Sequence, residues 1–282
     1  MTSQILKTIT RRPSGTIAHL TISRPSKLNA LNTPLLLSLP STLKSIASSN
    51  RDLLAVVLTG AGPKAFIGGA DIAEMASLAS PSAAREFITK VSDACSAVRE
   101  CPVPVIARVN GYALGAGLEI AACCDFRVAS RNAVFGMPKV GNSSYIFSVL
   151  CFREKFLFTL PFSKLTKKVR VGIPSVVEAA LLPGLIGWGR ARRLLMLGEN
   201  IDAEEALRWG LVEKVVEVEE LDGAVEGWLG LLDGNGPLAV RKQKALMRIW
   251  ENESLDRAIR AGIDAFGESF VADAQERRNR AR

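Results

Sequence analysis

Histidine is nearly absent from this chain of 282 residues, which contains one, His19. Catalysis by Ser-His-Asp or Cys-His arrangements is therefore not expected, and neither is a metal site built from several histidines. His19 lies in an alternating stretch typical of a strand, which favours a structural role. The five cysteines show no CxxC spacing, and their odd number fits reduced thiols inside a cell.

Long apolar runs are missing as well. No stretch of about 18 uncharged apolar residues occurs, so no membrane partner or membrane span is expected. The first residues contain no apolar signal core, and the C-terminus is not a peroxisomal tripeptide of the SKL type. With 48% hydrophobic and 23% charged residues, the composition favours a soluble intracellular protein. Cytoplasm, peroxisome and mitochondrion remain alternative locations.

The formal net charge of +8 raises the question of nucleic-acid binding. Residues 140–168 contain five basic residues and one acidic residue, and so supply half of this charge. The other basic residues are scattered among acidic ones and lack interleaved aromatic residues. We therefore expect no nucleic-acid partner.

Strand and helix patterns alternate along the N-terminal half. Apolar runs typical of strands occupy residues 15–23, 53–60 and 104–109, and an amphipathic helix is predicted over 82–99. Another helix is predicted from about Thr33, with a kink at Pro40. Repeated strand–helix units predict an α/β fold with mostly parallel strands. From about residue 187 onward the patterns are helical.

Two Gly-rich turns each lead from a predicted strand into a predicted helix: FIGGADIAEM (66–75) and GYALGAGLEI (111–120). Small residues let the backbone approach a ligand, and the first turn of a helix has unpaired N–H groups. Two such N–H groups that converge on one carbonyl oxygen form an oxyanion hole. Glu119 follows the second turn on an apolar helix. Burial should raise its pKa, which suits acid–base catalysis.

The two turns belong to a larger set of motifs: RPSKLNALN (24–32), KAFIGGADIAEM (64–75), GYALGAGLEIAACCD (111–125) and FGMP (135–138). Together with residues 169–216, this set resembles the enoyl-CoA hydratase/isomerase, or crotonase, family. The resemblance covers nearly the whole chain except residues 140–168.

Fold and assembly follow from this resemblance. It implies a ClpP-like spiral of ββα units over residues 1–200 and a helical C-terminal region over 201–282 that makes trimer contacts. It also implies an acyl-CoA thioester as the substrate, a homotrimer or a dimer of trimers, and no metal or redox cofactor.

The resemblance also assigns residues by position. It places the oxyanion hole at the backbone N–H groups of Ala70 and Ala116, and acid–base catalysis at Glu119. Gly68, Ala70 and Ile72 would line the path of the adenine and pantetheine groups, and two lysines would bind the phosphates. The full set expected to contact coenzyme A is Lys27, Ala30, Lys64, Gly68, Ala70, Asp71, Ile72 and Gly117.

Lys139 departs from the family pattern, because the second catalytic glutamate of the hydratases would stand at this position. A charged lysine only donates hydrogen bonds. It would act as a proton donor if burial lowered its pKa, or it would form an ion pair with Glu119 or point away. Glu178 is a further carboxylate expected near the acyl pocket, and a possible substitute.

Residues 140–168 follow Lys139 and contain five of the eleven phenylalanines. Their deletion restores an unbroken family pattern. Val140 is always encoded from GT, and Lys168 ends in AG when its codon is AAG. Our hypothesis is a translated intron, in which case transcripts would join residue 139 to residue 169. A lineage-specific loop near the site and a membrane-lying aromatic loop are the alternatives.

Hydration or dehydration of an enoyl-CoA is the predicted activity, with the thioester enolate held in the oxyanion hole. Double-bond isomerisation is the second reading. The third is an impaired homologue that binds acyl-CoA, because Lys139 replaces the second glutamate. The acyl group and the pathway, including fatty acid metabolism, cannot be read from these motifs.

Overall fold

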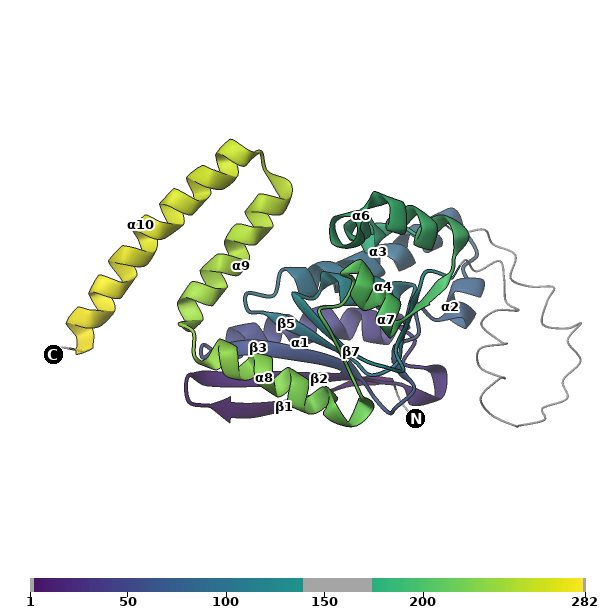
Figure 1. The fold of residues 1–282 in the computed structure, drawn as a ribbon. Coiled ribbons are helices and arrows are strands. Elements are labelled where there is room, and N and C mark those ends of the chain that lie inside the picture. The colour runs from purple at the N-terminus through teal and green to yellow at the C-terminus, as the bar shows by residue number, and fades with distance from the viewer. Residues whose placement is uncertain (1–2, 139–173, 281–282) are drawn as a thin grey trace, which may run out of the picture.

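The computed structural model describes residues 3–138 and 174–280, with side chains as far as residue 270. Two β-sheets lie at its centre, with helices on both faces of the larger sheet (Figure 1). Of the eight strand pairings in the two sheets, six are parallel and two are antiparallel. The predicted α/β fold with mostly parallel strands is therefore confirmed.

The larger sheet has six strands. Their order is β1 (Gln4–Arg12), β2 (Gly15–Ser23), β3 (Leu53–Gly60), β5 (Val105–Val109), β7 (Phe126–Ser130) and β10 (Lys214–Val216). β1 pairs with β2 antiparallel, and the other pairs are parallel, with Val57 opposite Ile106 between β3 and β5. The near-continuous burial of β3 and β5 is typical of parallel strands covered on both faces.

The smaller sheet has four strands, in the order β4 (Ala65–Ile67), β6 (Tyr112–Leu114), β8 (Val134–Gly136) and β9 (Asn200–Asp202). Successive units of the chain give one strand to the larger sheet and the next to the smaller one. β3 and β4, β5 and β6, and β7 and β8 are the three pairs that do so. This repeated ββα pattern is the expected spiral.

Three helices form the layer against the sheets: α1 (Thr33–Ser49), α3 (Pro81–Arg99) and α4 (Ala116–Cys123). Asn32 begins α1, because its side chain accepts a hydrogen bond from Leu35 N at 3.3 Å. The helix continues through Pro40 to Ser49. The helix predicted over 82–99 is confirmed as α3.

The opposite face of the larger sheet is covered by α8 (Leu221–Asp233), whose Leu221, Val225 and Leu229 pack against Ile17 and its neighbours. Short elements complete this part of the chain: η1 (Pro25–Lys27), α2 (Ile72–Ala76), η2 (Val177–Leu181), α6 (Leu182–Arg192), η3 (Arg193–Leu197), α7 (Ala203–Trp209) and η4 (Val218–Glu220). The expectation of helices alone after residue 187 is wrong in one respect, because β9 and β10 each pair at a sheet edge.

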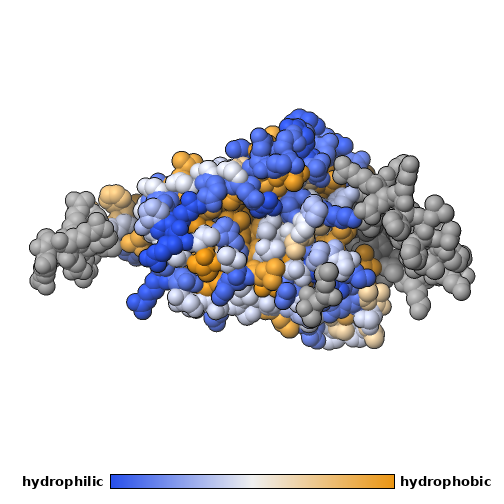
Figure 2. All heavy atoms as spheres, turned by 90° about the horizontal axis from the view of Figure 1, so that it is seen from below, coloured by the Kyte–Doolittle hydropathy of each residue, from blue (hydrophilic) through white to orange (hydrophobic). Residues whose placement is uncertain are grey.

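Helices α9 (Pro237–Asn252) and α10 (Leu255–Arg280) lie side by side as a hairpin at one end of the molecule (Figure 1). Arg241 of α9 contacts the larger sheet, because it donates a hydrogen bond to the carbonyl of Leu53 in β3 at 2.7 Å. Figure 2 shows apolar side chains among hydrophilic ones at this end of the molecule. On α10, apolar residues spaced three or four apart are strongly exposed: Leu255, Ile259, Ile263, Phe266 and Phe270. Within the described part of the chain, no helix combines the length and hydropathy that crossing a membrane requires.

Candidate active site

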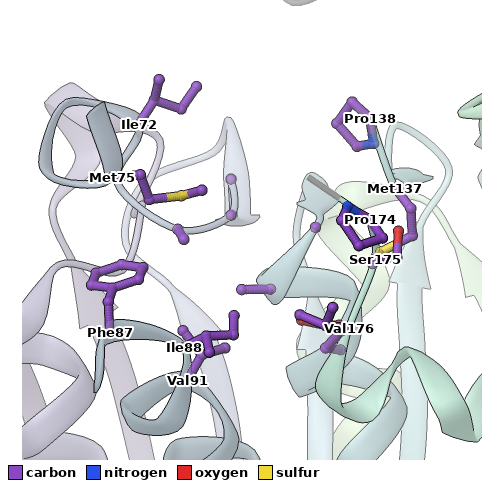
Figure 3. A pocket seen from close by; sticks show the side chains of 16 residues that line it. Ile72, Met75, Phe87, Ile88, Val91, Met137, Pro138, Pro174, Ser175 and Val176 are labelled. Atoms are coloured by element: carbon purple, nitrogen blue, oxygen red, sulfur yellow. The ribbon is translucent and has the colours of Figure 1, made fainter. Parts of the chain in front are cut away.

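A pocket of about 130 Å³ opens between α2 and α3 on one side and the segments before residue 138 and after residue 174 on the other (Figure 3). Figure 3 shows apolar side chains from both sides facing this space. One wall consists of Ile72, Met75, Phe87, Ile88 and Val91, and the other of Met137, Pro138, Pro174, Ser175 and Val176. The base consists of Gly68, Gly69, Ala70, Gly115, Ala116 and Glu119.

The first hydrogen-bond donor in the pocket lining is the backbone N–H group of Ala70. Leu31 pairs with this turn: its N–H donates to Gly69 O at 2.8 Å, and its carbonyl accepts from Asp71 N at 2.8 Å. Both bonds engage the neighbours of Ala70, so the N–H of Ala70 points away from Leu31. This N–H has no acceptor among the residues that the structure describes.

Ala116 supplies the second donor as the first residue of α4. Gly115 turns the chain from β6 into the helix with φ of +51°, a conformation that favours glycine. An N–H in the first turn of a helix has no acceptor within the helix. Ala70 and Ala116 line the same pocket, so their backbone N–H groups are the candidate donors of an oxyanion hole.

A close approach between α4 and β4 sets the spacing of these donors. A Cβ atom on Gly117 would lie 2.0 Å from the carbonyl oxygen of Ile67. Only glycine therefore lets the start of α4 pack against the end of β4. Gly117 has this packing role and does not itself line the pocket.

Asp71 stabilises the first Gly-rich turn. Its carboxylate accepts hydrogen bonds from Ala73 N at 2.8 Å and Glu74 N at 3.1 Å, and it forms an ion pair with Arg24. Burial alone would raise the pKa of Asp71, but the hydrogen bond from Arg24 and those from the backbone outweigh it and lower the pKa. Arg24 also donates to the carbonyl of Ala30 at 3.1 Å. These contacts hold the turn that carries Ala70.

Glu119 is the acidic side chain of the pocket base, and its residue is only 4% exposed. One carboxyl oxygen accepts a hydrogen bond from Ala179 N at 3.2 Å. Burial raises the pKa of Glu119 to about 7, a rise to which the charge of Glu178 adds and which the bond from Ala179 opposes. Both protonation states are therefore populated near neutral pH, as acid–base catalysis requires.

Five predicted residues line the pocket: Gly68, Ala70, Ile72, Ala116 and Glu119. The other predicted contacts lie outside its lining. Lys27 and Lys64 are exposed at the surface, and Ala30, Asp71 and Gly117 make the structural contacts described above. Lys139 and residues 140–168 lie outside the described residues. Within those residues, no group of three or more potential metal ligands occurs.

Sequence reasoning missed the apolar walls. Met75 comes from α2, and Phe87, Ile88 and Val91 come from α3. The period of 82–99 predicts an apolar helix face, but a face that lines a pocket has the same period as one that packs in the core. Glu178 was expected near the acyl pocket. It is buried and does not line the pocket, although its neighbour Ala179 donates a hydrogen bond to Glu119.

Comparisons with known proteins agree with this geometry. The enoyl-CoA hydratase/isomerase family model matches residues 12–144 and 157–280. The interruption of the match lies within residues 140–168. A crotonyl-CoA hydratase of Syntrophomonas wolfei is 37% identical over 261 residues, which cover 92% of this chain and 88% of the relative. A short-chain-enoyl-CoA hydratase of Clostridium acetobutylicum is 35% identical over 272 residues, covering 96% and 92%.

Solved structures give the same result. An enoyl-CoA hydratase from Bacillus anthracis aligns with a TM-score of 0.75 at 29% identity, covering 93% of this chain and 89% of that one. An enoyl-CoA hydratase from Thermoplasma volcanium aligns with a TM-score of 0.75 at 29% identity, covering 97% of both chains. Sequence, fold and pocket geometry together show that the chain belongs to the enoyl-CoA hydratase/isomerase family and has the crotonase fold.

Proposed function

We propose that this protein is an enoyl-CoA hydratase that adds water to short-chain 2-enoyl thioesters of coenzyme A. The observation that carries the proposal is the base of the pocket. There, the titratable carboxyl group of Glu119 lies in the same cavity as the N–H groups of Ala70 and Ala116. The two hydratases that are 37% and 35% identical support the same activity.

The reaction needs one site that binds the thioester carbonyl oxygen and one group that takes up and returns a proton. The thioester oxygen would accept hydrogen bonds from Ala70 and Ala116, which stabilise the negative charge of an enolate. Ionised Glu119 would take a proton from water as the water oxygen bonds to the β-carbon. The same carboxyl group would then return the proton to the α-carbon. The product is a 3-hydroxyacyl-CoA, and the enzyme ends in its starting state.

The two similar hydratases are named for crotonyl-CoA and short-chain enoyl-CoA, so we take a short acyl group as the part of the substrate that enters the pocket. The apolar walls formed by Phe87, Val91 and Val176 suit such a group, because burying its hydrocarbon surface favours binding.

Coenzyme A binding and assembly complete the proposal. Lys27 and Lys64 are exposed cations, and a lysine ammonium group suits phosphate as a point charge. The exposed apolar stripe on α10 supports a homotrimer or a dimer of trimers, because monomeric proteins rarely expose such a stripe. The chemistry above uses the side chains and backbone alone, so we propose that no cofactor beyond the coenzyme A of the substrate is required.

Double-bond isomerisation is the second candidate. Among the described residues, Glu119 is the one carboxylate in the pocket lining, and a single carboxyl group suffices to move a proton between two carbons of an acyl chain. Lys139 favours a third candidate, an impaired homologue, because it stands where the hydratases of this family would have a second glutamate. A Lys139→Glu variant lacking residues 140–168 should then gain activity over its Lys139 counterpart.

Incubation in isotopically labelled water distinguishes these candidates. With crotonyl-CoA, a hydratase produces a 3-hydroxyacyl-CoA that contains the labelled oxygen, which mass spectrometry detects. With 3-butenoyl-CoA, an isomerase produces crotonyl-CoA without labelled oxygen. We expect the labelled hydroxyacyl product. Conversion of 3-butenoyl-CoA alone would favour the isomerase, and an unchanged substrate in both mixtures would favour the impaired homologue.

A further inference from the structure

Two buried asparagine side chains bind the first residue of β4. Asn29 is 0% exposed and Asn110 is 4% exposed. Both side-chain amides donate to the carbonyl oxygen of Ala65, Asn29 at 2.8 Å and Asn110 at 3.2 Å. A carbonyl oxygen has two lone pairs, so it can accept from both amides. Ala65 begins β4, the strand that leads into the first Gly-rich turn.

Asn29 connects this carbonyl to the segment that pairs with the first turn. Leu28, the residue before it, accepts a hydrogen bond from Gly68 N in that turn at 2.8 Å. The amide of Asn29 also donates to Ala61 O at 3.0 Å, and its side-chain oxygen accepts from Arg24 N at 3.0 Å. The backbone of Asn29 has φ of +57°, a conformation that asparagine tolerates better than most residues. The side chain therefore ties the segment before α1 to the start of β4.

Asn110 connects the same carbonyl to the second Gly-rich turn. It lies between β5 and β6, and β6 leads into α4. Its amide also donates to Gly60 O at 3.0 Å and to Gly62 O at 2.6 Å. Its side-chain oxygen accepts from Thr59 Oγ1 at 3.3 Å. Asn110 thus joins the end of β3, the loop before β4 and the start of β6.

The backbone ladder between β4 and β6 is short. Each strand has three residues, and the register shifts between Ala65 and Ile67. A register shift disrupts a ladder locally, so these strands have few backbone bonds to fix their relative position. The two asparagine amides add contacts from both sides at the residue where the pairing begins.

We propose that Asn29 and Asn110 are positioning residues for the oxyanion hole. Their shared bonds to Ala65 hold the two Gly-rich turns, and therefore the two backbone donors, at a fixed separation. The role that this gives them in hydration rests on the proposed function. Neither asparagine lines the pocket, so each acts through the backbone and not by contact with the substrate.

Isotope-edited infrared spectroscopy of bound butyryl-CoA tests the proposal without turnover, because this saturated thioester has no double bond to hydrate. Hydrogen bonds from the oxyanion hole lower the stretching frequency of its ¹³C-labelled carbonyl. We expect a clear decrease on binding to the wild type and a smaller one in Asn29→Asp and Asn110→Asp. An ionised aspartate keeps the acceptor oxygen and lacks the amide donors.

Turnover gives a second readout for the same variants. A misplacement of about 1 Å costs about 10²-fold in rate, so kcat for crotonyl-CoA should fall by this order, with a much smaller change in KM. Asn29→Ser and Asn110→Ser replace an aspartate variant that does not fold. The shorter hydroxyl removes the amide donors without placing a negative charge among carbonyl oxygens, and any one folded variant of the four decides the question.

The control is Asn50→Asp. The amide of Asn50 donates to Ile46 O at 2.9 Å at the end of α1, so this substitution removes a comparable bond outside the pocket lining. It should keep the wild-type carbonyl frequency and kcat. A folded variant at Asn29 or Asn110 that also keeps both would overturn the proposal. If the wild type lowers the carbonyl frequency but does not hydrate crotonyl-CoA, the proposed function fails, while the infrared comparison still decides the role of the two asparagines.

Discussion

Glu119 meets two opposing physical demands. Burial beside apolar walls makes its ionised form costly, while acid–base catalysis needs both protonation states near neutral pH. Its pKa of about 7 suits the proposed acid–base role, and it lowers the stability of the folded protein when the carboxyl group is ionised. A carboxyl group with a raised pKa binds its proton more tightly in the folded state. Its stabilising contribution is therefore complete at pH values below 4.5 and is lost as the pH rises through about 7.

Glu119→Gln should consequently stabilise the protein at high pH. The pKa rises from the ordinary 4.5 to about 7, which corresponds to about 3 kcal/mol at most. Unfolding by urea at pH 4.5 and at pH 8 measures the effect. The variant should gain stability relative to the wild type between these two values. A difference between the two proteins that does not change with pH would contradict this account of Glu119.

At the residue scale, the sequence predicted what short motifs encode. Glu119 is an isolated acid on an apolar helix, and the raised pKa expected from its burial is confirmed. The partners of Asp71 were not predictable, because Arg24 lies 47 positions away and only the fold brings the two side chains together. The same limit applies to Asn110 and Ala65, which are 45 positions apart.

Two strand-to-helix turns position the site at the scale of elements. Each turn follows a strand of the smaller sheet, β4 or β6, and these strands pair in parallel. The turns therefore emerge at the same edge of that sheet. Both were visible in the sequence as Gly-rich segments after apolar runs. The apolar walls were not, since they depend on which face of α3 the fold turns toward the pocket.

Gly117→Ala tests the close contact of α4 with β4. The added Cβ would lie 2.0 Å from the carbonyl oxygen of Ile67, so α4 must shift and carry Ala116 N–H with it. Loss of one oxyanion-hole donor lowers kcat by about 10²–10³-fold, and we expect a decrease of this order in a protein that circular dichroism shows to be folded.

Gly223→Ala is the matched control for this substitution. Gly223 lies in α8, and its Cβ would meet no atom within 4 Å. The control should keep the wild-type kcat, and its helix should gain up to about 1 kcal/mol of stability. A folded Gly117→Ala protein with the kcat of the control would show that the contact does not position the donor.

For the whole molecule, the exposed stripe on α10 is the feature that a single chain leaves unexplained. Phe266 and Phe270 are 75% and 71% exposed, whereas aromatic side chains of this size contribute most when buried. The helical character of this region was predicted from amphipathic patterns, and α9 and α10 confirm it. A subunit interface leaves no separate signal in such a pattern.

Phe266→Glu should weaken the proposed trimer. A buried charge at the centre of an apolar contact costs several kcal/mol unless it is paired. Analytical ultracentrifugation should show a trimer or hexamer for the wild type and smaller species for the variant. Glu268→Gln, which changes a neighbouring exposed polar residue on α10, is the control and should assemble like the wild type. A monomeric wild type, or a variant that assembles equally well, would contradict the proposal.

Hydration of crotonyl-CoA by the wild type and by Glu119→Gln, followed as loss of the enoyl thioester absorbance at neutral pH, tests the central claim most directly. We predict turnover by the wild type and a kcat lower by about 10²–10⁴-fold in the variant. KM should change little, because the two backbone donors and the apolar walls are retained. Absence of turnover in the wild type, or equal turnover in the two proteins, would contradict the account.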